Sequence, residues 1–194
     1  MSVLTTTNNL QRPAVAIIGA GAAGITCARV LKDHGCQVTV FEKSRGLGGR
    51  LATRRGNHGM AFDHGVQYVT ARGSDFREYM YGALAEGAAA LWHPVRADAT
   101  ERPQQDLFVG TPTMNAFLKL ATSGIEFRLQ TEVESIERHS NGWTVGTSGE
   151  DVTELFDIVV STAPAPQAQA LLSGEAWLGQ ELTDVTIAPC WALL

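Results

Sequence analysis

Six residues near the amino terminus have the types and spacing of a loop that binds phosphate groups. The run Gly19-Ala20-Gly21-Ala22-Ala23-Gly24 places glycine at its first, third and sixth positions. In such a loop the first glycine makes a tight turn, the second lets backbone N–H groups reach a pyrophosphate, and the third lets a helix pack closely on a strand. The alternative is a glycine-rich turn without a ligand, and the elements around the run decide between the two.

Those elements must hold the loop at one edge of a sheet. Ala14 to Ile18 is a continuous apolar run, typical of a strand that is buried on both faces. We expect a helix over Ala23 to His34, ended by Gly35 in the left-handed conformation, and a second strand over Gln37 to Phe41. The order strand, helix, strand predicts two parallel strands with a right-handed crossover, which is the setting in which the glycine run binds a dinucleotide.

An acidic residue completes this unit. Glu42 ends the second predicted strand, where a carboxylate can accept hydrogen bonds from the hydroxyl groups of a ribose. The same charge would repel a 2′-phosphate, so NADP is disfavoured in this position. The amino-terminal residues therefore predict binding of a dinucleotide with an unmodified ADP half.

A second glycine-rich segment follows closely. Gly46-Leu47-Gly48-Gly49-Arg50 ends with two glycines and an arginine, and Thr53 and Arg54 come shortly after. The glycines let the backbone approach a ligand, and Arg50 can neutralise a phosphate. The alternative is a solvated basic surface formed by the four arginines of this stretch, Arg45, Arg50, Arg54 and Arg55.

This segment resembles the second fingerprint of flavin-containing amine oxidases, desaturases and their relatives, in which an acidic residue is followed by Gly-Gly-Arg and Thr-x-Arg. The resemblance implies FAD as the cofactor. A narrower resemblance is to renalases, because Asp63-His64-Gly65-Val66-Gln67-Tyr68-Val69-Thr70 is similar to their Asp-x-Gly-x-Gln-Tyr-x-Thr stretch. Phe108 to Met114 is similar to another renalase segment, although Thr113 stands where bacterial members often carry glycine.

The resemblance also implies which residues contact FAD. The glycine loop and Glu42 would hold the ADP half, and Gln67 and Tyr68 would lie beside the isoalloxazine ring. The backbone of Val133 would meet the adenine, and Ala163-Pro164 would form a turn that borders the cofactor. For Gln67 and Tyr68 the alternative is ordinary strand packing. The full set of expected cofactor residues is Gly19, Gly21, Ala22, Ala23, Gly24, Glu42, Lys43, Gly49, Arg50, Gln67, Tyr68, Val133, Ala163 and Pro164.

The rest of the chain predicts an α/β fold. Asn141-Gly142 is a strong hairpin signal between Glu132–Arg138 and Trp143–Thr147, and a further turn at 148–150 predicts a three-strand meander. Residues 44–72 are expected to be largely irregular, with a short strand pair around Ala61–Val69, and residues 93–105 are expected to be a loop or insertion. Further helices are expected at Asp75–Glu86, Thr113–Ser123 and Gln167–Leu172, and further strands at Glu126–Leu129 and Asp157–Ser161.

These elements predict a Rossmann-type FAD-binding domain with a β-meander crossover, interleaved with part of a substrate domain. We assign residues 13–72 and 106–165 to the FAD-binding domain, and residues 73–105 to a substrate-domain insertion. Residues 166–194 are expected to begin the rest of the substrate domain. Because the chain stops within the apolar run from Pro189 to Leu194, we expect it to be the front part of a longer protein.

The composition argues against several classes of function. The formal net charge is −5 and lysine and arginine form no stripe, which disfavours nucleic acid or an anionic membrane as partner. Cys27, Cys36 and Cys190 lack metal-ligand spacing, so we expect a reduced, cytoplasmic chain without a metal site. The amino terminus also lacks the features of a signal peptide.

The sequence therefore predicts an FAD-dependent oxidoreductase. The resemblance to renalases implies a small-molecule substrate, an isomeric dihydronicotinamide dinucleotide, which is oxidised to NAD(P)⁺ while O₂ is reduced to H₂O₂. Two alternatives stay open, a flavin-containing amine oxidase and an FAD-binding fragment without turnover. No catalytic residue and no oligomeric state is predicted, and His64, beside the expected flavin strand, is assigned a structural role.

Overall fold

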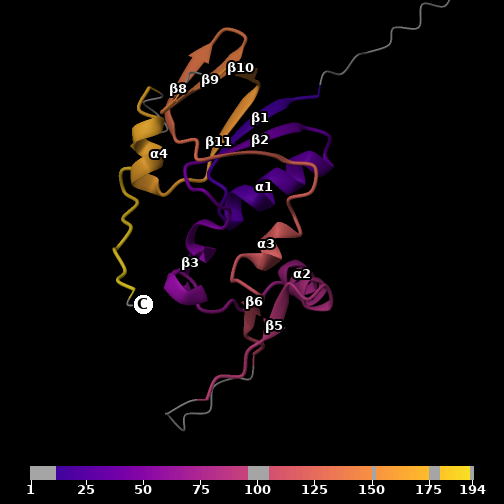
Figure 1. The fold of residues 1–194 in the computed structure, drawn as a ribbon. Coiled ribbons are helices and arrows are strands. Elements are labelled where there is room, and N and C mark those ends of the chain that lie inside the picture. Colours follow the sequence, from indigo (N-terminus) through magenta and orange to yellow (C-terminus); the bar gives the residue numbers. More distant parts are fainter. Residues whose placement is uncertain (1–11, 96–104, 150–151, 175–179, 193–194) are drawn as a thin grey trace, which may run out of the picture.

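The computed structural model describes residues 12–95, 105–149, 152–174 and 180–192. Its centre is a sheet of parallel strands in the order β11-β1-β2-β7 (Figure 1). The fold is α/β and Rossmann-like, as predicted. The strands of this sheet are β1 (Ala14–Ile18), β2 (Gln37–Glu42), β7 (Glu126–Leu129) and β11 (Ile158–Ser161).

Helix α1 (Ala22–Asp33) covers one face of the sheet. Alternate residues of β1 pack against this helix, because Val15 and Ile17 are fully buried in the cluster that includes Ala28 of α1. The helix ends as the sequence predicts, since Gly35 has a φ of +87° and donates its N–H to the Lys32 carbonyl oxygen at 3.0 Å. The predicted strand–helix–strand unit is therefore confirmed, with the helix shifted by one residue at each end.

The opposite face of the sheet is covered by an antiparallel meander of β8 (Val133–His139), β9 (Gly142–Thr147) and β10 (Val152–Phe156). Ala16 and Ile18 of β1 and Phe41 of β2 pack in the core on this side of the sheet. Phe41 and Phe156 are each 1% exposed, and their rings meet edge to face with centroids 5.9 Å apart. The Asn141-Gly142 turn joins β8 to β9, which confirms the predicted hairpin and meander.

A second packed body lies below the sheet in Figure 1 and has a core of its own. Met80 and Phe117 lie in this core together with Ile25 of α1, so the helix is shared by both bodies. The Tyr79 hydroxyl donates to the Phe117 carbonyl oxygen at 2.5 Å and ties two of its helices together. The elements of this body are α2 (Ser74–Ala85), β5 (Ala89–Leu91), β6 (Phe108–Gly110) and α3 (Ala116–Lys119).

One prediction of secondary structure is wrong in this lower body, and one strand pair was not predicted. The helix predicted over Thr113–Ser123 spans only Ala116–Lys119, because Thr113 and Asn115 form a hydrogen-bonded turn before it. The antiparallel pair of β5 and β6 was not predicted, and it joins residues from both sides of the predicted domain boundary at 105. Residues 96–104 of the predicted loop lie outside the described residues.

Short elements connect the two bodies. The largely irregular stretch contains an antiparallel hairpin of β3 (Thr53–Arg55) and β4 (Ala61–Asp63). Strand β4 lies in the range Ala61–Val69 where a short strand pair was expected, but its partner β3 lies before that range. The 3-10 turn η1 (Gly49–Leu51) precedes the hairpin, and η2 (Asn57–Gly59) lies between its strands. After β11 comes α4 (Ala165–Leu171).

Among the helices in the described ranges, none has the length and apolarity to cross a membrane.

Cys27 gives a first testable consequence of this packing. Its side chain packs against the cluster between α1 and the sheet, and burial raises the pKa of its thiol. A higher pKa leaves a smaller thiolate fraction at a given pH, so we expect Cys27 to react with a disulfide reagent at pH 8 more slowly than the exposed Cys190. Cys27→Ser and Cys190→Ser variants assign the kinetic phases, and loss of the fast phase in Cys27→Ser would contradict the expectation.

Candidate functional site

The candidate site lies at the carboxyl edge of the parallel sheet. There the loop Gly19–Gly24 follows β1, Glu42 ends β2, and Thr162 follows β11. Strand β1 is the point at which the strand order reverses, because β2 lies on one side of it and β11 on the other. Ligands of open α/β sheets bind outside the carboxyl ends of the strands at such a point.

The first glycine loop is too tightly packed for side chains at two positions. Gly19 has a φ of +101° and donates its N–H to the Phe41 carbonyl oxygen at 2.8 Å. A Cβ atom at Gly24 would lie 1.9 Å from the Gly19 carbonyl oxygen. The first turn of α1 can therefore approach the end of β1 only because residue 24 is glycine.

The amino terminus of α1 is suited to hold an anion. Gly21 is the N-cap and supplies no side-chain hydrogen bond, and the first turn of the helix contains no acidic residue. Ala22 and Ala23 are exposed and lie in the first turn of this twelve-residue helix, where backbone N–H groups have no partner within the helix. These residues fit a pyrophosphate.

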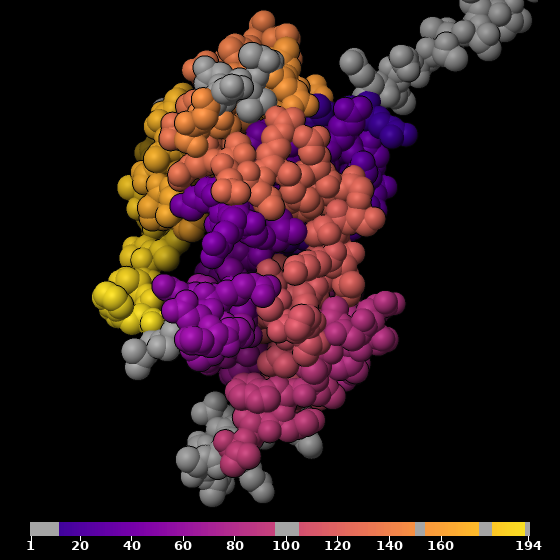
Figure 2. All heavy atoms as spheres, viewed as in Figure 1, coloured from indigo at the N-terminus to yellow at the C-terminus, as the bar shows by residue number. Residues whose placement is uncertain are grey.

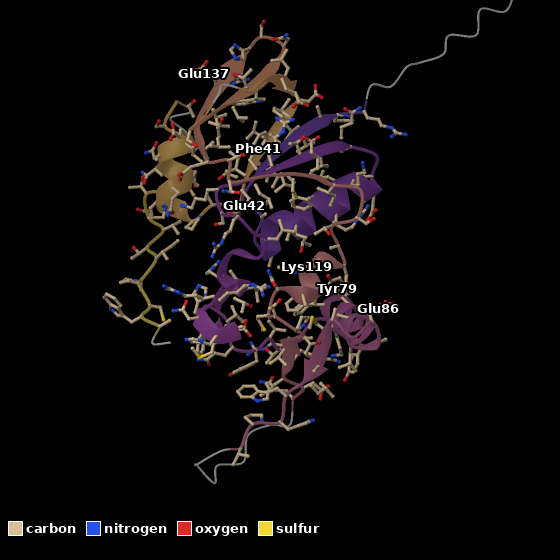
Figure 3. The ribbon with its side chains drawn as sticks, in the orientation of Figure 1. Phe41, Glu42, Tyr79, Glu86, Lys119 and Glu137 are labelled. Atoms are coloured by element: carbon tan, nitrogen blue, oxygen red, sulfur yellow. The ribbon has the colours of Figure 1, made fainter. Side chains whose placement is uncertain are left out.

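Glu42 is fixed against the first glycine loop. The residue is only 8% exposed, and its carboxylate accepts the Ala20 N–H at one oxygen and the Ser44 N–H at the other, both at 2.8 Å. Figure 3 shows its side chain at the end of β2, near the beginning of α1. Each carboxylate oxygen has further lone-pair capacity, so the group can also accept from a ribose diol.

The second glycine segment lies directly against the first. Gly48 donates its N–H to the Ala20 carbonyl oxygen at 2.8 Å and pairs with Gly21 in a parallel bridge. Gly49 has a φ of +54°, and a Cβ atom there would lie 3.2 Å from the Gly21 Cα. Two stretches of backbone without side chains thus share one surface, as a cradle for a pyrophosphate and its riboses requires.

Four of the predicted cofactor residues lie at or near this edge. Thr131 donates its N–H to the Glu42 carbonyl oxygen at 3.0 Å, which places the buried Val133 near the end of β2. Lys43 is exposed, with its Nζ 3.7 Å from an oxygen of Glu132. Ala163-Pro164 follows directly on Thr162, beside the first glycine loop.

Thr162 itself was not singled out from the sequence. Its hydroxyl donates to the Ile18 carbonyl oxygen at 2.9 Å and lies 3.2 Å from that of Gly19. It therefore fixes the exit of β1 into the loop. The available signal was a hydroxyl residue between an apolar strand and the Ala163-Pro164 turn.

Gln67 and Tyr68 lie on the connection between β4 and the bridge of Val69 with Phe108. Both side chains are exposed, and the Tyr68 ring lies 5.6 Å from that of Trp92, centroid to centroid. This connection passes the second glycine segment, because a Cβ atom at Gly65 would come within 2.0 Å of the Arg50 carbonyl oxygen. Their expected place beside the isoalloxazine stays a prediction.

The four arginines around the second glycine segment are all exposed, and none of the ion pairs between described residues involves them. Arg54 also lines a surface hollow of about 480 Å³ together with Met60, Phe62 and Ala192. In Figure 2 the yellow carboxy-terminal segment lies beside the purple hairpin that carries these residues. The β3–β4 hairpin therefore combines exposed positive charge with an apolar surface.

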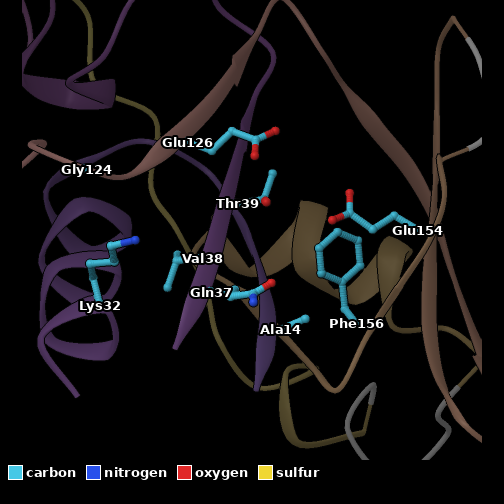
Figure 4. Close-up of a pocket in the computed structure, with 9 residues that line it drawn as sticks. All are labelled: Ala14, Lys32, Gln37, Val38, Thr39, Gly124, Glu126, Glu154 and Phe156. Atoms are coloured by element: carbon cyan, nitrogen blue, oxygen red, sulfur yellow. The ribbon is translucent and has the colours of Figure 1, made fainter. Parts of the chain in front are cut away.

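Another hollow, of about 280 Å³, has a different position. It is lined by Ala14 and Gln37, the first residues of β1 and β2, and by Lys32 and Glu126 among others (Figure 4). These residues lie at the amino edge of the strands, at the end remote from the glycine loops. In the described part of the chain, no group of three or more His, Cys, Asp or Glu side chains could hold a metal ion.

Comparison with known proteins agrees with this geometry. Residues 17–82 match the family described as "NAD(P)-binding Rossmann-like domain", and residues 78–185 match the family described as "Flavin containing amine oxidoreductase". The chain is 36% identical over 107 residues to the FAD-dependent oxidoreductase dbaF of Emericella nidulans, covering 53% of this chain and 23% of that protein. It is 41% identical over 64 residues to an L-amino-acid oxidase of Siganus canaliculatus, covering 32% of this chain and 12% of that protein.

A carotenoid phi-ring synthase of Streptomyces griseus is 52% identical over 40 residues, which cover 21% of this chain and 8% of that enzyme. The matches thus span less than a quarter of each of these three relatives. Among solved structures, a protein of Exiguobacterium sp. 255-15 assigned as a protoporphyrinogen oxidase superposes with a TM-score of 0.64 at 13% identity. That match covers 83% of this chain and 61% of the other, and it shows the shared fold.

Proposed function

We propose a specific oxidase activity for this chain, which belongs to the flavin-containing amine oxidoreductase family and has FAD as its cofactor. In the proposed reaction an isomeric dihydronicotinamide dinucleotide, O₂ and a proton give NAD(P)⁺ and H₂O₂. The observation that carries this choice of substrate is the exposed guanidinium group of Arg54, which lines one hollow together with Phe62. A cation next to an aromatic wall suits an anionic, ring-bearing substrate better than a cationic amine.

The chain's own residues supply binding and orientation. The N–H groups at the start of α1 and the two glycine segments would hold the pyrophosphate, and Glu42 would hold the adenosine ribose. When bound, FAD supplies the redox chemistry, taking two electrons from the substrate and passing them to O₂. Oxidation of a dihydropyridine removes one hydrogen with both electrons and leaves no proton for a base, so His64 is assigned no proton transfer.

The oxidation of an L-amino acid is the second candidate, and the similarity to L-amino-acid oxidases favours it. Such a substrate also carries a carboxylate that Arg54 could bind. Its amine must, however, lose a proton before oxidation, and the neighbouring guanidinium groups would repel the ammonium form. The two candidates therefore differ in which compound reduces the protein.

We also propose a cytoplasmic location. Cys27, Cys36 and Cys190 are free thiols in the structure. Free thiols persist in reducing compartments, whereas oxidising compartments favour disulfides.

Anaerobic reduction of the purified protein tests the proposal. We expect the visible absorbance of the oxidised flavin to bleach rapidly with dihydronicotinamide isomers and slowly with L-leucine or benzylamine. Arg54→Ala should slow bleaching by the dinucleotide about tenfold at low concentration, whereas Arg55→Ala, the next residue on β3, should change it little. Rapid bleaching by an amine or amino acid alone would overturn the choice of substrate, and bleaching by none would support a binding unit without turnover.

A further inference from the structure

We propose that Asn115 is a positioning residue that holds the second glycine segment against the first and thereby controls how tightly FAD is retained. Nothing in the sequence patterns or the comparisons assigns this residue a role. The inference rests on FAD binding at the glycine loops, and it does not depend on which substrate is oxidised.

Asn115 lies directly on the turn that enters the Gly-Gly-Arg segment. Its Nδ2 donates to the Leu47 carbonyl oxygen at 2.6 Å. A Cβ atom at Gly48 would lie 2.8 Å from the Asn115 Cβ and 3.2 Å from its Nδ2. The side chain therefore both anchors the carbonyl of this turn and packs on its glycine.

The anchored carbonyl belongs to the peptide group that joins the two glycine loops. The Leu47 C=O and the Gly48 N–H are the two polar ends of one planar peptide unit. Asn115 holds the C=O end, and the N–H end donates to the Ala20 carbonyl oxygen at 2.8 Å. Asn115 thus sets the orientation in which this peptide can reach the first loop.

That orientation needs an anchor because Gly48 places few limits on it. Gly48 has a φ of +123°, in a region that only glycine visits readily, so the peptide before it can rotate at little steric cost. Rotation of the peptide would take the Gly48 N–H away from Ala20 and separate Gly48 from Gly21. The shared backbone surface for the pyrophosphate would then be lost.

The Asn115 amide is itself oriented by its neighbours. The Thr113 hydroxyl donates to Asn115 Oδ1 at 2.8 Å, which leaves the NH₂ group facing Leu47. The Met114 N–H donates to Asp63 Oδ1 at 3.3 Å, and the Thr53 hydroxyl is hydrogen-bonded to the same oxygen, so the turn before α3 is tied to β3 and β4. Asn115 is also the N-cap residue of α3, but it makes no side-chain cap bond to this four-residue helix.

The test measures FAD release in the absence of substrate, from the recovery of flavin fluorescence after dilution. Asn115→Asp keeps the shape of the side chain but replaces the donor with a second acceptor, and Asn115→Ala removes both groups. We expect both variants to release FAD about 3- to 10-fold faster than the wild type. Asn141→Asp, an exposed residue in the β8–β9 turn, is the matched control and should release FAD at the wild-type rate.

A pH series separates positioning from general destabilisation. When protonated, the carboxyl group introduced by Asn115→Asp can donate to the Leu47 carbonyl oxygen. We compare each release rate with that of Asn115→Ala at the same pH. As the pH falls from 8 to 5, this ratio for Asn115→Asp should therefore fall towards the ratio for the wild type. The proposal would be overturned if both variants released FAD at the wild-type rate at every pH. It would also be overturned if the substitutions destabilised the apoprotein as much as the FAD complex.

Thr113→Val gives a second variant that keeps the contact between Asn115 and Gly48. It removes only the hydroxyl that orients the amide, so we expect an intermediate release rate. A release rate at or below that of the wild type would count against the proposal, even if the Asn115 variants fail to fold. Absence of FAD from the wild-type protein would instead refute the cofactor site itself.

Discussion

Replacing Gly24 with alanine is expected to remove FAD retention almost completely and to lower the free energy of unfolding by about 1–3 kcal/mol. The new Cβ would lie 1.9 Å from the Gly19 carbonyl oxygen and 3.0 Å from the Thr162 hydroxyl oxygen. The loop backbone and the buried end of β1 cannot make room for this Cβ atom unless the first turn of α1 also moves. The measurements are the flavin-to-protein ratio after gel filtration and the denaturant midpoint of the apoprotein.

Gly82→Ala is the matched control for this change. Gly82 lies inside α2, and a Cβ atom there would have no neighbour within 4 Å. The same substitution should therefore stabilise the protein by about 0.5–1 kcal/mol, because alanine loses less conformational freedom in a helix. Equal effects of the two substitutions would contradict the tight packing at Gly24.

Glu42→Ala is expected to weaken FAD binding by about 10- to 150-fold, the equivalent of a charge-assisted hydrogen bond of about 1.5–3 kcal/mol. The variant loses the acceptor for a ribose diol and leaves the N–H groups of Ala20 and Ser44 without the carboxylate. Titration of the apoprotein with FAD, followed by fluorescence quenching, gives the dissociation constant.

Two further variants make the Glu42 result specific. Glu42→Gln should also weaken binding, because an amide NH₂ group must then face one of the backbone N–H donors. Glu126→Gln changes an exposed carboxylate on the neighbouring strand β7 and should leave FAD affinity unchanged. An unaltered dissociation constant in Glu42→Ala would remove the assignment of Glu42 to the ribose.

The central unit could be predicted from the sequence because its signals are local. The apolar run of β1, the glycine loop and Gly35 each restrict the backbone through their own residues, and the structure places them within one residue of the prediction. The same holds for Asn141-Gly142, since a type of turn that favours glycine specifies the hairpin by itself.

The lower body was harder to predict because distant contacts decide it. The apolar spacing from Thr113 to Ser123 is helical. The Asn115 side chain, however, donates a hydrogen bond to the carbonyl oxygen of Leu47, 68 residues away, and the helix begins only at Ala116. Strands β5 and β6 have three residues each, too few for an alternating pattern to show.

The residues of the candidate site also differ in whether the sequence alone could predict them. The glycines and Glu42 carry a signal in residue type and spacing. Thr162 and Asn115 act through carbonyl groups of residues far away in the chain, and any backbone carbonyl could have been their partner. The carbonyl partners in such contacts leave no pattern in a single sequence, so only the structure reveals them.

The most direct test of the account asks which part of the cofactor the protein binds. FAD, FMN and ADP are titrated separately into the apoprotein, and ADP is then tested as a competitor of FAD. If the glycine loops and Glu42 hold the ADP half, FAD binds at least about 100-fold more tightly than FMN, and ADP competes with it. Equal affinity for FAD and FMN, or failure of ADP to compete, would contradict the central claim.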